Sequence, residues 1–185
     1  MRLMRTRPHL VDGLKNLIEY TEISDGKMIE LGCYVGESTE IFASSGRFSE
    51  ISAIDPWLGD YDDKDFASRA DMTGVEKSFD ERMGGFDNIK KVKLMGDEAV
   101  DKFEDKSLDL VYIDACHTYK AVKNDIEKWL PKLKDTGFIA GHDIRMRGVR
   151  KAVNHTVGKP EKKFMDDSWV VSMKKIREDQ QNTTN

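Results

Sequence analysis

Apolar residues recur along the chain in short runs with two different spacings. Between residues 10 and 18 they lie three and four positions apart, which predicts an amphipathic helix covering a sheet. The runs that follow are four to six residues long, and turn residues bound them, which predicts strands. The run Leu-Val-Tyr-Ile at residues 110–113 is apolar throughout, as is typical of a strand buried on both faces.

Predicted strands and helices alternate over most of the chain. The strands are expected at residues 27–31, 50–54, 91–95, 110–113 and 137–141, with two weaker strands around 163–165 and 169–173. Helices are expected at 37–44, at 96–103, in the segment that carries Val122, Ile126 and Trp129, and at 148–157. This order predicts an α/β fold: a doubly wound, mostly parallel seven-stranded sheet with helices on both faces.

A single domain is expected over residues 1–176, followed by a flexible polar tail at 177–185. One connection is much longer than the others. Its first part, residues 57–73, has no helical spacing, whereas Val75, Phe79 and Met83 that follow it do. We interpret 57–73 as a lid over the ligand, with Trp57 and Tyr61 available to contact a ring. A solvated acidic loop is the alternative.

Composition narrows the class of protein. The 185 residues carry a net charge of −4, and 35% are charged. Because affinity for phosphates needs clustered Lys and Arg, this balance argues against a nucleic-acid or anionic-membrane partner. No apolar run approaches the ~18 residues of a membrane span, and the N-terminus lacks the apolar core of a signal peptide. Cys33 and Cys116 are interpreted as reduced thiols, and a cytoplasmic location is expected.

Candidate binding residues follow the first two strands. Gly32 and Gly36 lie in the turn between the first strand and a helix, where glycine tolerates positive φ and the helix N-terminus attracts an anion. Asp55 ends the second strand. Its carboxylate is placed to accept hydrogen bonds from the two hydroxyls of a ribose, or else to form an Asx turn before Pro56.

Further polar residues follow the next three strands. Gly96, Asp97 and Glu98 come after the third strand, where they are placed to bracket an adenine ring. A buried carboxylate needs a partner, so Asp114 at the end of the apolar fourth strand is expected to have a ligand, a metal or hydrogen-bond donors. His117 lies three residues later, and the fifth strand ends at His142 and Asp143.

These segments together resemble class I S-adenosylmethionine-dependent methyltransferases. The segment MIELGCYVGEST (28–39) resembles the first motif of that family, and residues 108–144 are similar to the sugar O-methyltransferase branch known as methyltransferase family 24. One departure is Tyr34, which stands at the usual middle glycine. The resemblance implies S-adenosylmethionine as cofactor. It also implies cofactor contacts from these residues: Glu30, Gly32, Cys33, Tyr34, Gly36, Ser38, Asp55, Trp57, Gly96, Asp97, Glu98 and Asp114.

Two roles within that set stay open. Glu30 either contacts the cofactor or hydrogen-bonds the turn, and Trp57 either stacks on adenine or anchors the long loop. The candidate catalytic residues are Asp114, His117, His142 and Asp143. Asp114, His142 and Asp143 are candidate ligands of Mg²⁺, which prefers oxygen donors, and the related sugar enzymes hold Mg²⁺ at these two strand ends. Without a metal, His117 or His142 is the candidate general base.

The expected function is O-methylation of a hydroxyl on a small polar molecule or sugar, with Mg²⁺ as an optional second cofactor. The alternatives are a non-catalytic S-adenosylmethionine-binding module and a cephalosporin-hydroxylase-like enzyme on the same fold. A dinucleotide-binding dehydrogenase is disfavoured, because GCYVG lacks the required glycine spacing. The sequence leaves the acceptor and the oligomeric state open, with a homodimer as one option.

Overall fold

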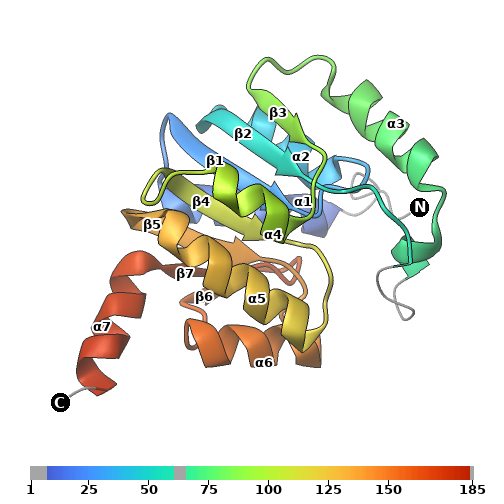
Figure 1. The fold of residues 1–185 in the computed structure, drawn as a ribbon. Coiled ribbons are helices and arrows are strands. Elements are labelled where there is room, and N and C mark those ends of the chain that lie inside the picture. The colour runs from blue at the N-terminus through green and yellow to red at the C-terminus, as the bar shows by residue number, and fades with distance from the viewer. Residues whose placement is uncertain (1–7, 61–65, 184–185) are drawn as a thin grey trace.

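The computed structural model describes residues 8–60 and 66–183. These residues form a seven-stranded sheet with the order β3-β2-β1-β4-β5-β7-β6 (Figure 1). Strands β1 to β5 pair in parallel, and β7 is antiparallel to both of its neighbours. The predicted doubly wound α/β fold is therefore confirmed.

The elements alternate as the sequence predicts. The strands are β1 (Gly26–Leu31), β2 (Phe48–Ile54), β3 (Ile89–Val92), β4 (Leu108–Ile113), β5 (Leu133–Gly141), β6 (Lys162–Lys163) and β7 (Trp169–Ser172). The helices are α1 (Pro8–Thr21), α2 (Glu37–Ser44), α3 (Met72–Met83), α4 (Gly96–Ala99), α5 (Tyr119–Trp129), α6 (Arg147–Thr156) and α7 (Met173–Thr183). Short 3₁₀ turns cover Phe66–Arg69, Val100–Lys102 and Leu130–Lys132.

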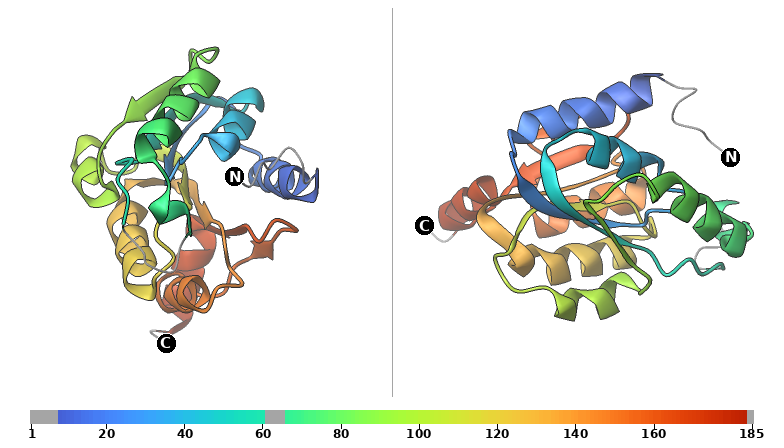
Figure 2. Two further views of the ribbon diagram at one scale, coloured as in Figure 1. Left: turned by 90° about the vertical axis from the view of Figure 1, so that its right-hand side faces the viewer. Right: turned by 90° about the horizontal axis from the view of Figure 1, so that it is seen from above.

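Helices cover both faces of the sheet, with α1 and α2 on one side and α4 and α5 on the other (Figure 2). Successive residues of β4 point to opposite faces. Leu110 and Tyr112 pack in the cluster that includes Leu14 of α1, whereas Val111 and Ile113 pack in the cluster that includes Trp129 of α5. Both faces of β4 are thus buried, which explains why this strand is apolar throughout.

The third strand and the C-terminal tail differ from expectation. The strand covers Ile89–Val92 instead of 91–95, because its register is set by pairing with Ile51–Ile54 of β2. Residues 177–183 of the expected tail belong to helix α7, whose Ile176 is buried in the core. Burial of the Ile176 side chain, one turn after the start of α7, holds the helix against the core although the residues after it are polar. The flexibility of this tail stays a prediction.

The long connection after β2 is anchored at both ends. The Trp57 side chain is 4% exposed and packs against Phe79 of α3. The Asp60 amide donates to the Ser68 carbonyl at 2.8 Å, and α3 begins at Met72, inside the expected lid. Residues 61–65, including Tyr61, lie outside the described residues, so the lid stays a prediction. No helix in the described part of the chain combines the length and apolarity that crossing a bilayer requires.

Candidate functional site

The turn after β1 has three residues in the left-handed region. They are Gly32 (φ 84°), Tyr34 (φ 48°) and Gly36 (φ 79°). This conformation costs a non-glycine residue about 1–2 kcal/mol. Two contacts keep Tyr34 in place: its amide donates to Asp55 Oδ2 at 2.9 Å, and its carbonyl accepts from Trp57 Nε1 at 2.9 Å. The departure from the usual glycine is therefore accommodated by residues that follow β2.

Asp55 connects the turns that follow β1 and β2. Its Oδ1 accepts from the Trp57 amide at 2.7 Å, which makes an Asx turn, and its Oδ2 accepts from Tyr34. Burial raises the pKa of Asp55, and the backbone hydrogen bonds oppose this effect. Each carboxylate oxygen can accept a second hydrogen bond. The Asx turn and a ribose contact are thus compatible, and the Trp57 indole anchors the loop.

Glu30 is fully buried and supports the start of α2. Its two oxygens accept hydrogen bonds from Ser38 and from Thr39, the latter at 2.5 Å. Burial is the main cause that raises its pKa to about 7. These hydrogen bonds connect Glu30 to the first turn of α2, whereas its contact with the cofactor stays a prediction. Cys33 beside it is also buried, with Sγ 3.5 Å from the Glu30 carbonyl oxygen.

The turn after β3 carries the next predicted binding residues. Gly96 begins α4 and packs near Leu31 of β1. The exposed Asp97 is 3.5 Å from Lys128 Nζ, and Glu98 accepts from the Met95 amide at 3.3 Å. Both carboxylates thus have local partners while remaining accessible to a ligand.

The four catalytic candidates come together in one cluster between the ends of β4 and β5. His117 Nε2 is 2.9 Å from Asp143 Oδ2 and 3.6 Å from Asp114 Oδ1. His142 Nδ1 is 3.3 Å from Asp143 Oδ2 and 3.9 Å from Asp114 Oδ1. The four side chains are 20–29% exposed, so the cluster is largely buried but open to a small molecule.

The backbone of neighbouring strands fixes the position of this cluster. The Asp114 amide donates to Leu31 of β1 at 2.8 Å, and the His142 amide donates to Ile113 of β4 at 3.1 Å. Asp143 has a left-handed φ of 56°, and its carbonyl accepts from the Met146 amide at 2.8 Å. Such strained residues are concentrated at functional sites.

The charges of the cluster balance. Burial lowers the pKa of each histidine, but the contacts with Asp114 and Asp143 outweigh it and raise the pKa of His117 to about 10 and that of His142 to about 9. Burial raises the pKa of Asp143, but the two histidines hold it well below its usual range. Both imidazoles are therefore protonated at neutral pH in the absence of ligands.

Either histidine of the cluster lies close enough to Asp114 and Asp143 to complete a set of metal ligands with them. Ligand atoms of Asp114, His117 and Asp143 all lie within 4.8 Å of one another. His142, the predicted third ligand, is not in this group, but its Nδ1 is 3.9 Å from Asp114 Oδ1 and 3.3 Å from Asp143 Oδ2, so its role as a ligand stays a prediction. The distance from each histidine to the two aspartates depends on the conformation of the loop after β4. The spacing of residues along the sequence does not predict that conformation.

A buried polar network next to His142 was not predicted from the sequence. The Tyr112 hydroxyl is 3.0 Å from Ser168 Oγ, which donates to Asp166 Oδ2 at 2.6 Å. Asp166 is 2% exposed and close enough to His142 for their charges to interact. The signal for it was Tyr112, because a buried tyrosine in an apolar strand usually has a partner for its hydroxyl.

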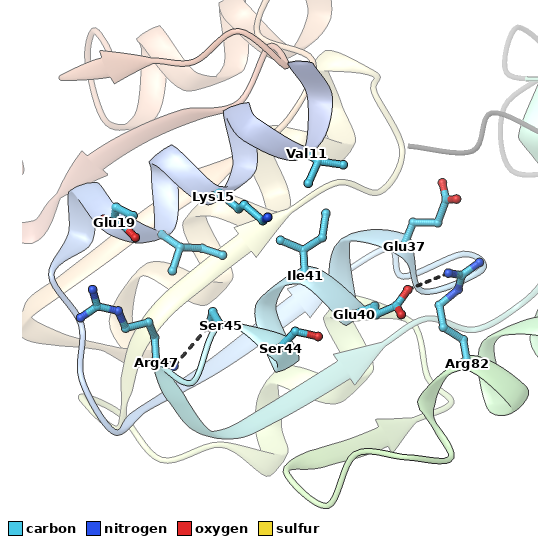
Figure 3. A pocket seen from close by; sticks show the side chains of 11 residues that line it. Val11, Lys15, Glu19, Glu37, Glu40, Ile41, Ser44, Ser45, Arg47 and Arg82 are labelled. Atoms are coloured by element: carbon cyan, nitrogen blue, oxygen red, sulfur yellow. Dashed lines mark hydrogen bonds and ion pairs between the residues drawn. The ribbon is translucent and has the colours of Figure 1, made fainter. Parts of the chain in front are cut away.

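A separate pocket of about 400 Å³ lies between α1 and α2 (Figure 3). Val11 and Ile41 give it an apolar lining, and Arg82 closes one end with an ion pair to Glu40 at 2.7 Å. Arg82 Nε also donates to the Val35 carbonyl at 2.9 Å. These contacts tie α3 to the turn after β1, and the residues lining the pocket do not include the catalytic candidates.

Comparison with known proteins gives a family match over most of the sheet. The model described as "Methyltransferase domain" matches residues 29–144. The uncharacterized protein y4gI of Sinorhizobium fredii is 30% identical over 130 residues, which cover 65% of this chain. The chain spans only 13% of the length of that relative.

Solved structures show the same fold at low identity. CalS11, a TDP-rhamnose 3′-O-methyltransferase of calicheamicin biosynthesis, superposes with a TM-score of 0.62 at 16% identity, over 92% of this chain and 81% of that one. A caffeoyl-CoA O-methyltransferase candidate from Staphylococcus aureus gives a TM-score of 0.59 at 18% identity, over 88% and 81%.

The first prediction concerns the pH dependence caused by Glu30. Its folded-state pKa of about 7 lies above the ordinary 4.5, so the folded protein binds this proton more tightly than the unfolded chain does. The resulting stability is fully present below pH 4.5 and is lost as the pH rises through about 7, by about 3 kcal/mol at most. Glu30→Gln should remove this loss. Urea unfolding of both proteins at pH 5 and pH 8 measures it, and an equal loss in both would contradict the assignment.

The second prediction separates backbone strain from close packing in the first turn. A Cβ at Gly32 would lie 2.2 Å from the Asp114 carbonyl oxygen, whereas a Cβ at Gly46, which also has positive φ, would meet nothing within 4 Å. Gly46→Ala should cost only the left-handed penalty of about 1–2 kcal/mol. Gly32→Ala should cost about 1–3 kcal/mol more, measured by urea unfolding. Equal losses would mean that the approach to Asp114 does not matter.

Proposed function

The chain belongs to the methyltransferase domain family, and we propose that it transfers the methyl group of S-adenosylmethionine to a hydroxyl of a small polar molecule or sugar. The observation that carries this proposal is the cluster of His117, His142, Asp114 and Asp143. It lies next to the glycine turn after β1, because the Asp114 amide bonds directly to Leu31. A cofactor in that turn would therefore be adjacent to groups that can handle a proton.

The cofactor is proposed to lie across the carboxyl ends of the parallel strands, where ligands bind in such sheets. The turn from Gly32 to Gly36 faces the methionine part, at the positive N-terminal end of α2. Asp55 accepts the ribose hydroxyls through the acceptor positions that Tyr34 and Trp57 leave free. Gly96, Asp97 and Glu98 lie on the adenine side.

The acceptor hydroxyl is proposed to lie at the cluster, with its oxygen facing the methyl group. The oxygen forms the new bond to carbon as the carbon–sulfur bond breaks, which leaves S-adenosylhomocysteine. The hydroxyl proton must leave to a base. Holding the oxygen and the methyl group in line accounts for a large share of the rate in such reactions. The sugar substrate of CalS11, which has the same fold, supports a sugar as one acceptor class.

The donor atoms of the cluster fit a divalent cation in part. Two carboxylates suit Mg²⁺, but a protonated His117 lies between them and compensates their charge. We propose that Asp114 and Asp143 hold the cation when it is present, and that the His117 side chain then moves from its place between the two carboxylates. A bound cation would lower the pKa of the acceptor hydroxyl. His117 or His142 would then take the proton, since a second positive charge nearby favours a neutral imidazole.

Direct proton removal without a metal is the second mechanism, and it predicts a different pH profile. Only a neutral imidazole accepts a proton, and the pKa of His117 in the ligand-free cluster is about 10. Metal-free turnover would therefore rise with pH through the neutral range and level off near the pKa of the base, which is about 10 for His117 and about 9 for His142. Turnover that needs a cation would instead stop when the cation is removed.

The third prediction tests cofactor binding through Asp55. Asp55→Ala removes the acceptors for the ribose hydroxyls and also releases the Tyr34 amide. The free energy of S-adenosylhomocysteine binding should become less favourable by about 1.5–3 kcal/mol for each charge-assisted hydrogen bond lost. Titration calorimetry of the wild type and the variant measures this, with NAD as a ligand that should not bind. An unchanged affinity in the variant would refute the proposed cofactor site.

The fourth prediction tests the chemistry. With radiolabelled S-adenosylmethionine and a panel of sugars, sugar nucleotides and phenols, label should pass to at least one hydroxylated acceptor. A chelator should stop turnover and leave S-adenosylhomocysteine binding intact, and Mg²⁺ should restore turnover. Activity that persists in chelator and increases with pH would favour the histidine base. Tight cofactor binding with no transfer to any member of the panel would favour a binding module.

A further inference from the structure

The second residue of α6 touches the backbone of the loop that carries His117. A Cβ on Gly148 would lie 2.5 Å from the His117 carbonyl oxygen and 3.1 Å from the Tyr119 amide nitrogen. Both neighbours are backbone atoms, so they cannot move aside as a flexible side chain would. Any larger residue at position 148 would therefore push α6 and the loop after β4 apart.

Space, and not backbone conformation, is the reason for glycine at this position. Gly32 and Gly36 have positive φ, whereas Gly148 lies in α6 without one. In an ordinary helix interior, glycine is less favourable than alanine by about 0.8–1.0 kcal/mol. The close approach to His117 explains why the helix carries glycine here.

Two contacts bridge the same gap between the loops after β4 and β5. One is the backbone contact of Gly148 with His117. The other is the ion pair of 2.9 Å between His117 and Asp143, a residue that lies five positions before Gly148 in the chain. The backbone contact therefore restrains the separation of the two segments that carry the imidazole and the carboxylate.

We propose that Gly148 is a positioning residue, which fixes the separation of His117 and Asp143 without touching either substrate or cofactor. Its consequence for turnover rests on the proposed function, whereas its effect on the His117 imidazole does not. Two other glycines approach the same stretch, but they restrain different residues. Gly32 lies against Asp114, and Gly141 lies against Ile113 and Trp169.

The test is the Gly148→Ala variant of the full chain, compared with Gly85→Ala. A Cβ at Gly85 would meet nothing within 4 Å, and its φ is not in the left-handed region, so this variant controls for a generic glycine-to-alanine change. The chain has four histidines, and their ring signals can be assigned by NMR with ¹⁵N-labelled histidine. The fifth prediction is that Gly148→Ala moves the His117 ring signals away from their wild-type positions, because the ring no longer lies at the same distance from Asp143, while those of His142 stay closer to the wild type.

Binding and turnover complete the experiment. The affinity for S-adenosylhomocysteine should stay unchanged in Gly148→Ala, whereas turnover on an accepted acceptor should fall by ~100-fold, the scale expected for a misplacement of about 1 Å. Gly85→Ala should match the wild type in all three measurements. This split distinguishes a local effect at the cluster from a general loss of structure.

Each result decides the proposal. Unchanged His117 signals in a folded Gly148→Ala protein would overturn it. So would a variant that fails to fold, because the contact would then be a requirement of the whole domain and not of the cluster. If the His117 signals move but even the wild type transfers no methyl group, the positioning role stands and the proposed function fails.

Discussion

Three backbones meet at the carboxyl edge of the sheet, and the candidate site depends on how closely they approach. β4 ends between β1 and β5, with hydrogen bonds from Asp114 to Leu31 and from His142 to Ile113. A Cβ on Gly32 would lie 2.2 Å from the carbonyl oxygen of Asp114, directly after β4. A Cβ on Gly141 would lie 2.4 Å from the carbonyl oxygen of Ile113, the last residue of β4. Because these contacts join backbone to backbone, the ends of the strands cannot shift independently. The turn after β1 and the cluster of Asp114, His117, His142 and Asp143 therefore keep a fixed position relative to each other.

Electrostatics explains why a cluster of four titratable side chains is tolerated at this edge. Burying a lone charge costs much, but two aspartates and two protonated histidines compensate one another. Glu30 has no such cationic partner among the contacts described. It receives hydroxyl hydrogen bonds instead, and its pKa rises to about 7. The same edge of the sheet thus contains one acid that is easily protonated and one, Asp143, that is not.

Strain at this edge is concentrated in the turns. Tyr34, Trp57 and Asp143, which follow three different strands, all have positive φ without being glycine. Hydrogen bonds among Tyr34, Asp55 and Trp57 stabilise the first two turns, so their conformation does not rely on glycine alone. The pocket between α1 and α2 is apart from these turns. The gathering of titratable side chains, more than the volume of a pocket, therefore locates the candidate site.

The sequence by itself determined the fold class and the residues at the strand ends. Alternating periods define strands and helices, and parallel strands place their carboxyl ends at one edge, so Asp55, Asp114 and Asp143 could be assigned to that edge without coordinates. Only the tertiary structure decided that His117 approaches Asp143 more closely than His142 does, that Trp57 is buried, and that Gly148 packs against the His117 backbone. It also decided the register of β3 and the helical state of residues 177–183. The physical reason is that these features depend on distances between segments far apart in the chain, which local patterns of polarity do not encode.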